Sequence, residues 1–243
     1  MHKNPARIPA TTVDVLGLAS PSGTGKLGSV TVLTPFLVCA IAVAALLLGE
    51  WRHSRAGVWL AKPVASLAFV WAALQSGATG SVYGEWLLAG LALCLAGDLL
   101  LIPVERPAVF RAGIFAFLLG HVAYAVAFLT RPISWLGMLG AGLLLFGLLR
   151  AVLRWLRPRL AADMVVPVHA YVIVIGAMAA VACAVSLAGG PWQVAAGALA
   201  FAASDVAVAR DRFVSQGFVN RAWGLPLYYA AQLTLAVTPA LSN

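Results

Sequence analysis

Ionisable side chains occur at four places inside otherwise apolar stretches of the sequence. They are Lys62, Asp98, His121 and Asp205, with His169 as a marginal fifth case near the start of another stretch. A charge at the centre of a bilayer is costly, so such residues persist where they have a partner or a task. Two carboxylates, an imidazole and an amine can together donate and accept protons. If Asp98 and Asp205 approach one another at low dielectric, one is expected to keep its proton, which gives a general acid and a general base.

Each of these residues also has a structural interpretation. Lys62 lies near the end of its apolar stretch, from which a long side chain can extend to the membrane surface. Lys62 and Asp98 could form a structural ion pair, and His121 could join two helices through a hydrogen bond. Taken one at a time, the residues are as compatible with packing as with chemistry.

Other catalytic signatures are absent from the sequence. It has no G-x-S-x-G motif of a serine hydrolase and no H-E-x-x-H motif of a zinc protease. The histidines are few and dispersed, although Asp98, His121 and Asp205 could in principle supply three zinc ligands. The three cysteines lie in different apolar stretches and predict neither a disulfide framework nor a metal site. We therefore expect no metal and no cofactor.

The composition is that of an integral membrane protein. Of the 243 residues, 62% are hydrophobic and only 10% are charged, whereas soluble domains carry about 25% charged residues. The net charge of +8 comes from short basic clusters between apolar stretches rather than from a continuous basic face. Such clusters are typical of loops at an anionic membrane surface, so we expect the bilayer, and not a nucleic acid, as the partner.

Eight apolar stretches have the length that a transmembrane helix requires, about 20 residues. None of the short connections alternates apolar and polar residues as barrel strands do. The sequence therefore predicts an all-α polytopic transmembrane bundle of eight helices, a single domain over residues 29–243 that follows a flexible tail over residues 1–28. The predicted helices are 29–49, 57–77, 85–103, 108–129, 134–153, 165–188, 192–210 and 223–241.

Basic residues are distributed unequally between the two sets of predicted loops. The face that includes the N-terminal tail contains only Lys3, Arg7, Lys26 and Arg131. Because cytoplasmic loops carry an excess of Lys and Arg, we expect the other, arginine-rich loops in the cytoplasm and both termini outside the cell membrane. The arginine-rich set consists of Arg52, Arg55, Arg106, Arg111, Arg150, Arg154, Arg157, Arg159, Arg210, Arg212 and Arg221.

This orientation places polar side chains from several helices at one depth. Lys62, Asp98, Tyr171, Asp205 and Tyr228 lie five or six residues from the cytoplasmic ends of their predicted helices. They are thus roughly 7–9 Å below that membrane face, and His121 is deeper. Helical spacing places Gly113, Phe117, Gly120, Tyr124 and Phe128 on the same helical face as His121. It places Gly197, Phe201 and Val208 on the same face as Asp205, with Ser204 beside them. Gln232 follows Tyr228 by four residues and so shares its face. The pattern predicts an interior polar site near the cytoplasmic leaflet.

Six segments, in order over residues 62–235, resemble the YhhN-like lysoplasmalogenases, a family of eight-span membrane proteins. No segment is specific by itself, whereas the ordered set is fairly specific. The segments are AKPVAS with Lys62, AGDLLL with Asp98, FRAGIFAFLLGHVAYAVAF with His121 and Tyr124, YVIVIGAM with Tyr171, GALAFAASDVAVA with Phe201, Ser204 and Asp205, and LYYAAQLTLA with Tyr228 and Gln232.

The resemblance implies a hydrolase that cleaves the vinyl-ether bond of lysoplasmalogens and releases a fatty aldehyde and a glycerophospho-base. A vinyl ether hydrolyses once its β-carbon is protonated. One of the two aspartates, Asp98 or Asp205, is therefore expected to deliver the proton, and the other to stabilise the cation and orient the water. Lys62 is expected to contact the lipid phosphate or an aspartate. The other expected pocket residues are His121, Tyr124, Tyr171, Phe201, Ser204, Tyr228 and Gln232.

Two other function classes compete with this interpretation. Intramembrane acids also occur in proton-coupled transporters of small molecules or lipids, although the chain has no evident inverted repeat or pair of broken helices. A metal-dependent membrane lipid amidase would use Asp98, His121 and Asp205 as ligands. The expected partners are an alkenyl-type lysophospholipid and the bilayer, and no oligomeric state is predicted.

Overall fold

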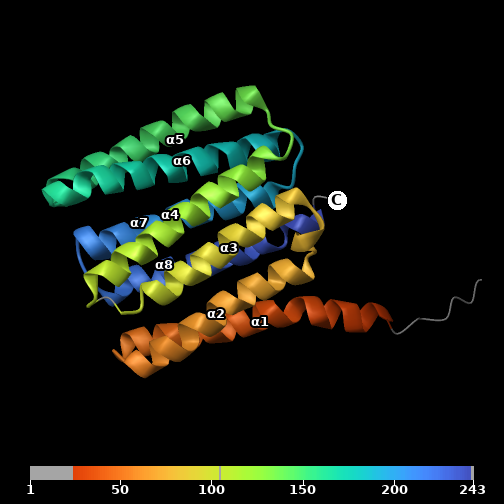
Figure 1. Cartoon of the computed structure of the whole chain (residues 1–243), viewed down its shortest axis with the longest axis horizontal. Helices are drawn as coiled ribbons and strands as arrows, with labels where there is room; N and C mark the ends of the chain where they lie inside the picture. The colour runs from red at the N-terminus through yellow and green to blue at the C-terminus, as the bar shows by residue number, and fades with distance from the viewer. Residues whose placement is uncertain (1–23, 104, 242–243) are drawn as a thin grey trace, which may run out of the picture.

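The computed structural model describes residues 24–103 and 105–241, which form eight long α-helices side by side in alternating directions (Figure 1). No β-strand occurs in these residues, so the all-α prediction is confirmed. The helices are α1 (Thr24–Trp51), α2 (Arg55–Gln75), α3 (Val82–Leu100), α4 (Pro107–Leu129), α5 (Trp135–Leu156), α6 (Val165–Leu187), α7 (Trp192–Phe213) and α8 (Phe218–Ala236). Short 3-10 turns are η1 (Ala78–Gly80), η2 (Arg157–Arg159), η3 (Ala162–Met164) and η4 (Thr238–Leu241).

Seven of the described helices, α1 to α7, are long and apolar enough to cross a membrane, as expected of a multi-pass membrane protein. The eighth helix does not meet the same criterion, because polar residues such as Asn220, Arg221 and Gln232 interrupt its sequence. In Figure 1, α8 nevertheless lies within the bundle beside its neighbours. An eighth crossing therefore remains a prediction.

The helix limits differ from the predicted ones mainly at the two ends of the chain. Residues 1–23 of the predicted tail lie outside the described residues, and α1 begins at Thr24, before the predicted boundary at residue 29. The last helix, predicted to begin at residue 223, begins at Phe218. Its first turn includes Asn220, whose side chain donates to Asp211 Oδ1 at 3.0 Å and to the Ser215 carbonyl at 2.6 Å. These bonds satisfy a polar helix start that hydropathy alone excludes.

Serine side chains define where several helices begin. The hydroxyls of Ser54, Ser81 and Ser134 each accept a hydrogen bond from a backbone N–H three residues later, at 3.1–3.2 Å. These bonds cap α2, α3 and α5 by satisfying N–H groups that have no partner inside the helix. The turn before α3 contains Gly77 with a φ of 75°, a conformation that favours glycine.

The bundle is built from four hairpins: α1 with α2, α3 with α4, α5 with α6, and α7 with α8. Helix α8 also contacts α1, α2 and α3, and α6 contacts α4 and α7, whereas α5 lies at the periphery with α6 as its main neighbour. Glycines permit the closest approaches. A Cβ on Gly90 of α3 would lie 2.5 Å from the Tyr124 ring of α4, and one on Gly224 of α8 would lie 2.5 Å from Ala207 of α7.

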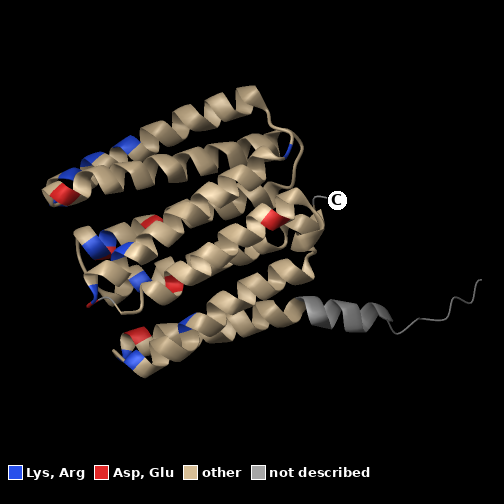
Figure 2. Cartoon of the chain, in the orientation of Figure 1, with Lys and Arg blue, Asp and Glu red and all other residues tan. Residues whose placement is uncertain are grey.

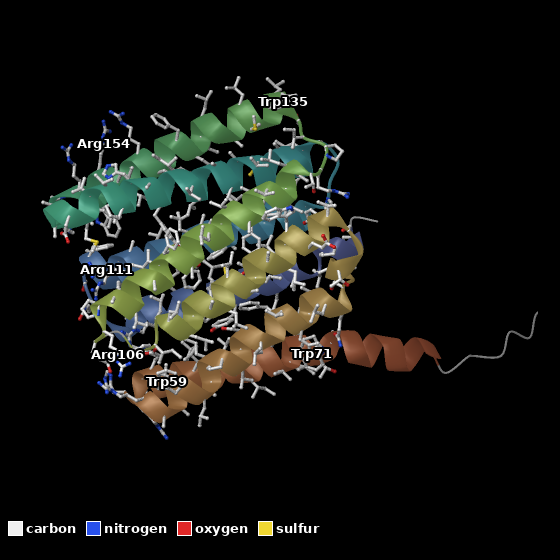
Figure 3. All side chains as sticks on the ribbon, in the orientation of Figure 1. Trp59, Trp71, Arg106, Arg111, Trp135 and Arg154 are labelled. Atoms are coloured by element: carbon white, nitrogen blue, oxygen red, sulfur yellow. The ribbon has the colours of Figure 1, made fainter. Side chains whose placement is uncertain are left out.

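Lys and Arg residues gather at one end of the bundle, on the left in Figure 2. This is the end that carries the α1–α2, α3–α4, α5–α6 and α7–α8 connections (Figure 1); we refer to it as the arginine-rich end. Figure 3 shows Arg106, Arg111 and Arg154 there, with Trp135 at the opposite end. The charge asymmetry is the basis for the predicted cytoplasmic orientation of this end.

Candidate active site

The Asp98 carboxylate is buried, and three side chains from two other helices contact it. Lys62 Nζ of α2 lies 3.3 Å from Asp98 Oδ1. Asp98 Oδ2 accepts hydrogen bonds from Ser66 Oγ of α2 at 2.7 Å and from the Tyr228 hydroxyl of α8 at 2.8 Å. The side chains of Lys62 and Asp98 are only 12% and 3% exposed. Both carboxylate oxygens thus face donors, an arrangement that suits an ionised carboxylate.

A second layer of polar contacts supports this group. Ser66 lies one helical turn after Lys62, so both project from the same face of α2. Its hydroxyl is also 3.0 Å from the Lys62 carbonyl and 3.2 Å from the Tyr229 hydroxyl. Since a hydroxyl has one proton, Tyr229 can donate to Ser66 while Ser66 donates to Asp98. We call Lys62, Ser66, Asp98, Tyr228 and Tyr229 the Asp98 cluster.

A second cluster forms around the imidazole of His121, which is fully buried on α4. Its Nδ1 lies 2.7 Å from the Phe117 carbonyl, one turn earlier, and its Nε2 lies 3.2 Å from Asp205 Oδ2 of α7. The Phe201 ring stacks on the imidazole with centroids 4.3 Å apart, and the Tyr171 ring of α6 meets its edge at 5.4 Å. We call His121, Asp205, Phe201 and Tyr171 the His121 cluster.

The hydrogen bond of His121 Nδ1 determines which form of the imidazole faces Asp205. A carbonyl oxygen only accepts, so Nδ1 carries a hydrogen, and in a neutral ring Nε2 then has a lone pair. A lone pair facing an ionised carboxylate would be repulsive. Both atoms, Nε2 and Oδ2, are buried, and neither has a hydrogen-bond partner among the described residues, so their 3.2 Å contact is not an aligned hydrogen bond. One proton between the two atoms, on the imidazole or on the carboxyl group, would remove this repulsion.

Contacts between aromatic rings link the two clusters. The Phe201 ring is 5.4 Å from Tyr228, and Phe117 packs against both, at 6.4 Å from Phe201 and 5.9 Å from Tyr228. No hydrogen bond or ion pair within the described chain joins Asp98 to Asp205, and each carboxylate has its own partners. The two acids thus belong to neighbouring clusters linked through Tyr228 and Phe201, rather than to a directly bonded pair.

Three other predicted pocket residues occupy different positions. The Tyr124 hydroxyl donates to Gln232 Oε1 at 2.6 Å. The centroid of the Tyr124 ring is 6.1 Å from that of Phe201, so Tyr124 and Gln232 lie beside the aromatic rings that link the clusters. Gln232 Nε2 is buried without a hydrogen-bond partner among the described residues. Ser204, in contrast, donates to the Phe201 carbonyl at 2.7 Å, so its hydroxyl bonds within its own helix.

The residues of the two clusters were also compared with the ligand sets that metals require. Within residues 24–103 and 105–241, no three His, Cys, Asp or Glu side chains come together as metal ligands. His121 and Asp205 meet, but Asp98 faces Lys62, Ser66 and Tyr228. The three candidate zinc ligands named from the sequence are therefore divided between the two clusters.

Two members of the Asp98 cluster, Ser66 and Tyr229, were not predicted from the sequence as site residues. A signal for Ser66 exists, because it follows Lys62 by four residues and so shares its helical face. Tyr229 is adjacent to Tyr228 and would be expected on another face, yet its ring packs against Tyr228 with centroids 4.8 Å apart. Only the packing of α2 against α8 brings its hydroxyl to Ser66.

Comparison with known proteins identifies relatives over most of the chain. A model of the YhhN family matches residues 57–238, from the start of α2 to the end of α8. The chain is 33% identical to "Lysoplasmalogenase TMEM86B" of Homo sapiens over 218 residues, 85% of each chain. It is 32% identical to "Lysoplasmalogenase TMEM86A" of Bos taurus over 163 residues, 65% of this chain and 66% of that relative. It is 31% identical to "Lysoplasmalogenase" of Mycobacterium tuberculosis over 152 residues, 60% of this chain and 56% of that relative.

The match to the TMEM86A relative of Bos taurus thus spans just under two thirds of its length. No solved structure gives a significant match to this chain. The family match covers every residue of the Asp98 and His121 clusters and leaves all of α1 outside. The coverage of the family model and the identity to the TMEM86B relative lead to one assignment: the chain belongs to the YhhN family.

Proposed function

We propose that this protein is a membrane-embedded lysoplasmalogenase, which hydrolyses the vinyl-ether bond of an alkenyl lysophospholipid. Membership of the YhhN family and the names of the relatives support the substrate class. The observation that carries the mechanism is the 3.2 Å contact between His121 Nε2 and Asp205 Oδ2, which one shared proton would make attractive. Vinyl-ether hydrolysis needs such a proton, together with water.

The reaction balances with water as the second substrate. Transfer of a proton to the β-carbon of the alkenyl chain forms a C–H bond and leaves an oxocarbenium ion. Water adds to the cationic carbon and returns a proton to the acid, giving a hemiacetal. The hemiacetal breaks its C–O bond to release a fatty aldehyde and the glycerophospho-base. The protein must therefore supply one acid, stabilise one cation and admit one water molecule.

Asp205, paired with His121, is our candidate for the proton donor. The Asp205 side chain is 14% exposed, whereas His121 is fully buried, so the carboxyl group is the more accessible member of the pair. The Phe117 carbonyl fixes the imidazole orientation, and Phe201 and Tyr171 hold its ring. His121 would then act as a positioning residue that supplies Asp205 with a proton and receives it back.

Asp98 suits the complementary role of a fixed negative charge. Lys62, Ser66 and Tyr228 all donate toward it, and each of these contacts stabilises a negative charge on the carboxyl group. A buried carboxylate near the reacting carbon would stabilise an oxocarbenium ion, and the adjoining faces of Tyr228 and Phe201 would add cation–π stabilisation. Lys62 has three donors and could contact a lipid phosphate in addition to Asp98.

The experiment uses detergent-purified protein and three lysophospholipids that differ only in an alkenyl, alkyl or acyl linkage. We expect aldehyde from the alkenyl compound alone. In D₂O, mass spectrometry of that aldehyde should show one deuterium on the carbon next to the carbonyl. Aldehyde without this deuterium would exclude protonation of the β-carbon. Activity that survives EDTA would argue against a metal-dependent hydrolase.

Variants assign the roles of the two acids. Asp205→Asn should lower kcat by about 100-fold or more, the usual effect of losing a general acid. His121→Gln should lower kcat as well, and the double variant should lose no more than the worse single variant if the two residues act as one unit. Asp163→Asn, an exposed aspartate in the α5–α6 connection, is the matched control. Full activity of Asp205→Asn would refute the assignment.

We further propose that all eight helices cross the cell membrane, with both termini outside and the arginine-rich end in the cytoplasm. Reporter fusions after α7 and after the C-terminus, scored for cytoplasmic or external activity, test this topology. Reporters on the same side of the membrane would refute the eighth crossing.

A further inference from the structure

A cavity of about 620 Å³ lies between α5 and α6, away from the two clusters described above. At the arginine-rich end its wall includes Arg150, Arg154 and Arg157, together with His169 of α6. The spacing of the three arginines, at i, i+4 and i+7, places them on one helical face. Three cationic groups thus converge on one end of a single cavity.

These arginines have no acidic partner in the described part of the chain. The ion pairs formed there involve Arg55 with Glu105 and Arg221 with Glu50 and Asp211, besides the buried contacts of Asp98 and Asp205. Excess positive charge in cytoplasmic loops is general for membrane proteins. It does not explain why three unneutralised guanidinium groups line the same cavity.

The remainder of the cavity wall is apolar and includes Gly142, Phe146, Gly176 and Ala180. A Cβ on Gly142 would meet no atom within 4 Å, so the space beside this residue is open. Phe146 is 63% exposed on the outer side of the bundle. The cavity is therefore amphipathic, with a cationic part at the arginine-rich end of the bundle and an apolar part between α5 and α6.

We propose that this cavity binds an anionic phospholipid of the surrounding bilayer. Its phosphate would lie among Arg150, Arg154 and Arg157, and one acyl chain would extend past Gly142. Basic pockets between transmembrane helices on the cytoplasmic side are suited to such headgroups. A zwitterionic lysophospholipid fits less well, because its cationic base would lie close to the same guanidinium groups. Helix α6 separates this cavity from the hydrolytic site, since Tyr171 contacts His121 while His169 lines the cavity.

The test measures lipid retention by the full-length protein in detergent, by native mass spectrometry. The probes are phosphatidylglycerol and phosphatidylcholine with identical acyl chains. We expect the wild type to prefer phosphatidylglycerol by about tenfold or more, given the contribution of each basic residue near a membrane surface. The combined variant R150Q/R154Q/R157Q should bind both lipids equally. Matched elution in gel filtration and an unchanged Tm without lipid establish that the variant is folded.

Two matched controls make the outcome specific to the cavity. R52Q/R106Q/R111Q removes the same charge from exposed arginines at the same end of the bundle and should keep the preference. Gly142→Leu fills the apolar part and should reduce retention of both lipids by about tenfold, whereas Gly147→Leu has equal space on α5 but does not line the cavity and should have no effect.

Three results would overturn the proposal. Equal loss in the two arginine variants would mean that the whole cytoplasmic face attracts anionic lipid. Equal retention by Gly142→Leu and Gly147→Leu would place the lipid elsewhere. Displacement of phosphatidylglycerol by an equimolar alkenyl lysophosphatidylethanolamine would make the cavity a substrate site. Because the first two results are measured without substrate, neither depends on whether the protein is a lysoplasmalogenase.

Discussion

The buried contact between Lys62 and Asp98 allows a quantitative test of how the bundle is held together. The perturbation is a double-mutant cycle made of Lys62→Met, Asp98→Asn and the combined variant. Both side chains are largely excluded from the surface, at 12% and 3% exposure. Removing one partner therefore leaves the other buried and incompletely compensated, whereas removing both leaves no net charge.

The magnitude follows from the separation of the charges. At 3.3 Å between Nζ and Oδ1, the Coulomb attraction is about 5 kcal/mol for an effective dielectric constant of about 20. Ser66 and Tyr228 still donate to Asp98 when Lys62 is absent, so part of that energy is retained. We expect Lys62→Met to lower the free energy of unfolding by about 3 kcal/mol.

The two single variants should differ from one another. When Asp98 is replaced by Asn, the partly exposed Lys62 can extend its ammonium group toward the membrane surface, so Asp98→Asn should cost only about 1–2 kcal/mol. The double variant should be close to Asp98→Asn in stability. The coupling free energy of the cycle is then about 3 kcal/mol, equal to the loss in Lys62→Met.

The assay is reversible unfolding in mixed detergent micelles, followed by tryptophan fluorescence. Arg55 and Glu105 provide a matched cycle, because their charges lie 3.4 Å apart but the side chains are 83% and 53% exposed. Surface pairs of this kind contribute about 0.2–1 kcal/mol. If the two cycles gave equal coupling, or if Lys62→Met unfolded at the wild-type denaturant concentration, burial would not govern the strength of this pair.

Three further predictions concern packing, the α7–α8 turn and metal dependence. Gly90→Ala places a methyl group 2.5 Å from the Tyr124 ring and should destabilise the protein by about 1–3 kcal/mol in thermal unfolding, as overpacking does; an unchanged Tm would mean that the ring moves freely. Arg221→Gln removes contacts with Glu50 and Asp211, and because Arg221 is 41% exposed the loss should stay below about 1 kcal/mol and vanish in high salt. Extensive dialysis against EDTA should leave aldehyde release unchanged, and restoration of lost activity by Zn²⁺ would contradict the metal-free mechanism.

The clearest agreement between sequence and structure concerns the helices. Six predicted spans, from 57–77 to 192–210, lie within about one turn of the observed helices α2 to α7 at each end. A long apolar stretch reports burial in lipid directly, because it depends on composition and not on neighbours. The start of α8 was misplaced because its polar residues are satisfied by Asp211 and Ser215, which precede it in the α7–α8 hairpin.

The partners of the buried acids could not be obtained in the same way. Helical spacing indicates which side chains share a face, but it does not indicate which helix lies opposite. Asp98 is 32 residues from Ser66 and 130 residues from Tyr228 in sequence. Their meeting depends on α2, α3 and α8 packing together, which the order of the segments does not specify.

The sequence by itself thus determined an all-α membrane protein with charge concentrated at one end and a small set of buried ionisable residues. These properties are sums over local composition, and they hold for any arrangement of the helices. The tertiary structure decided that Asp98 faces Lys62, Ser66 and Tyr228, that Asp205 faces His121, and that contacts between aromatic rings link the two clusters. Hydrogen bonds and ion pairs act over a few ångströms, so only the packing of helices distant in sequence fixes them.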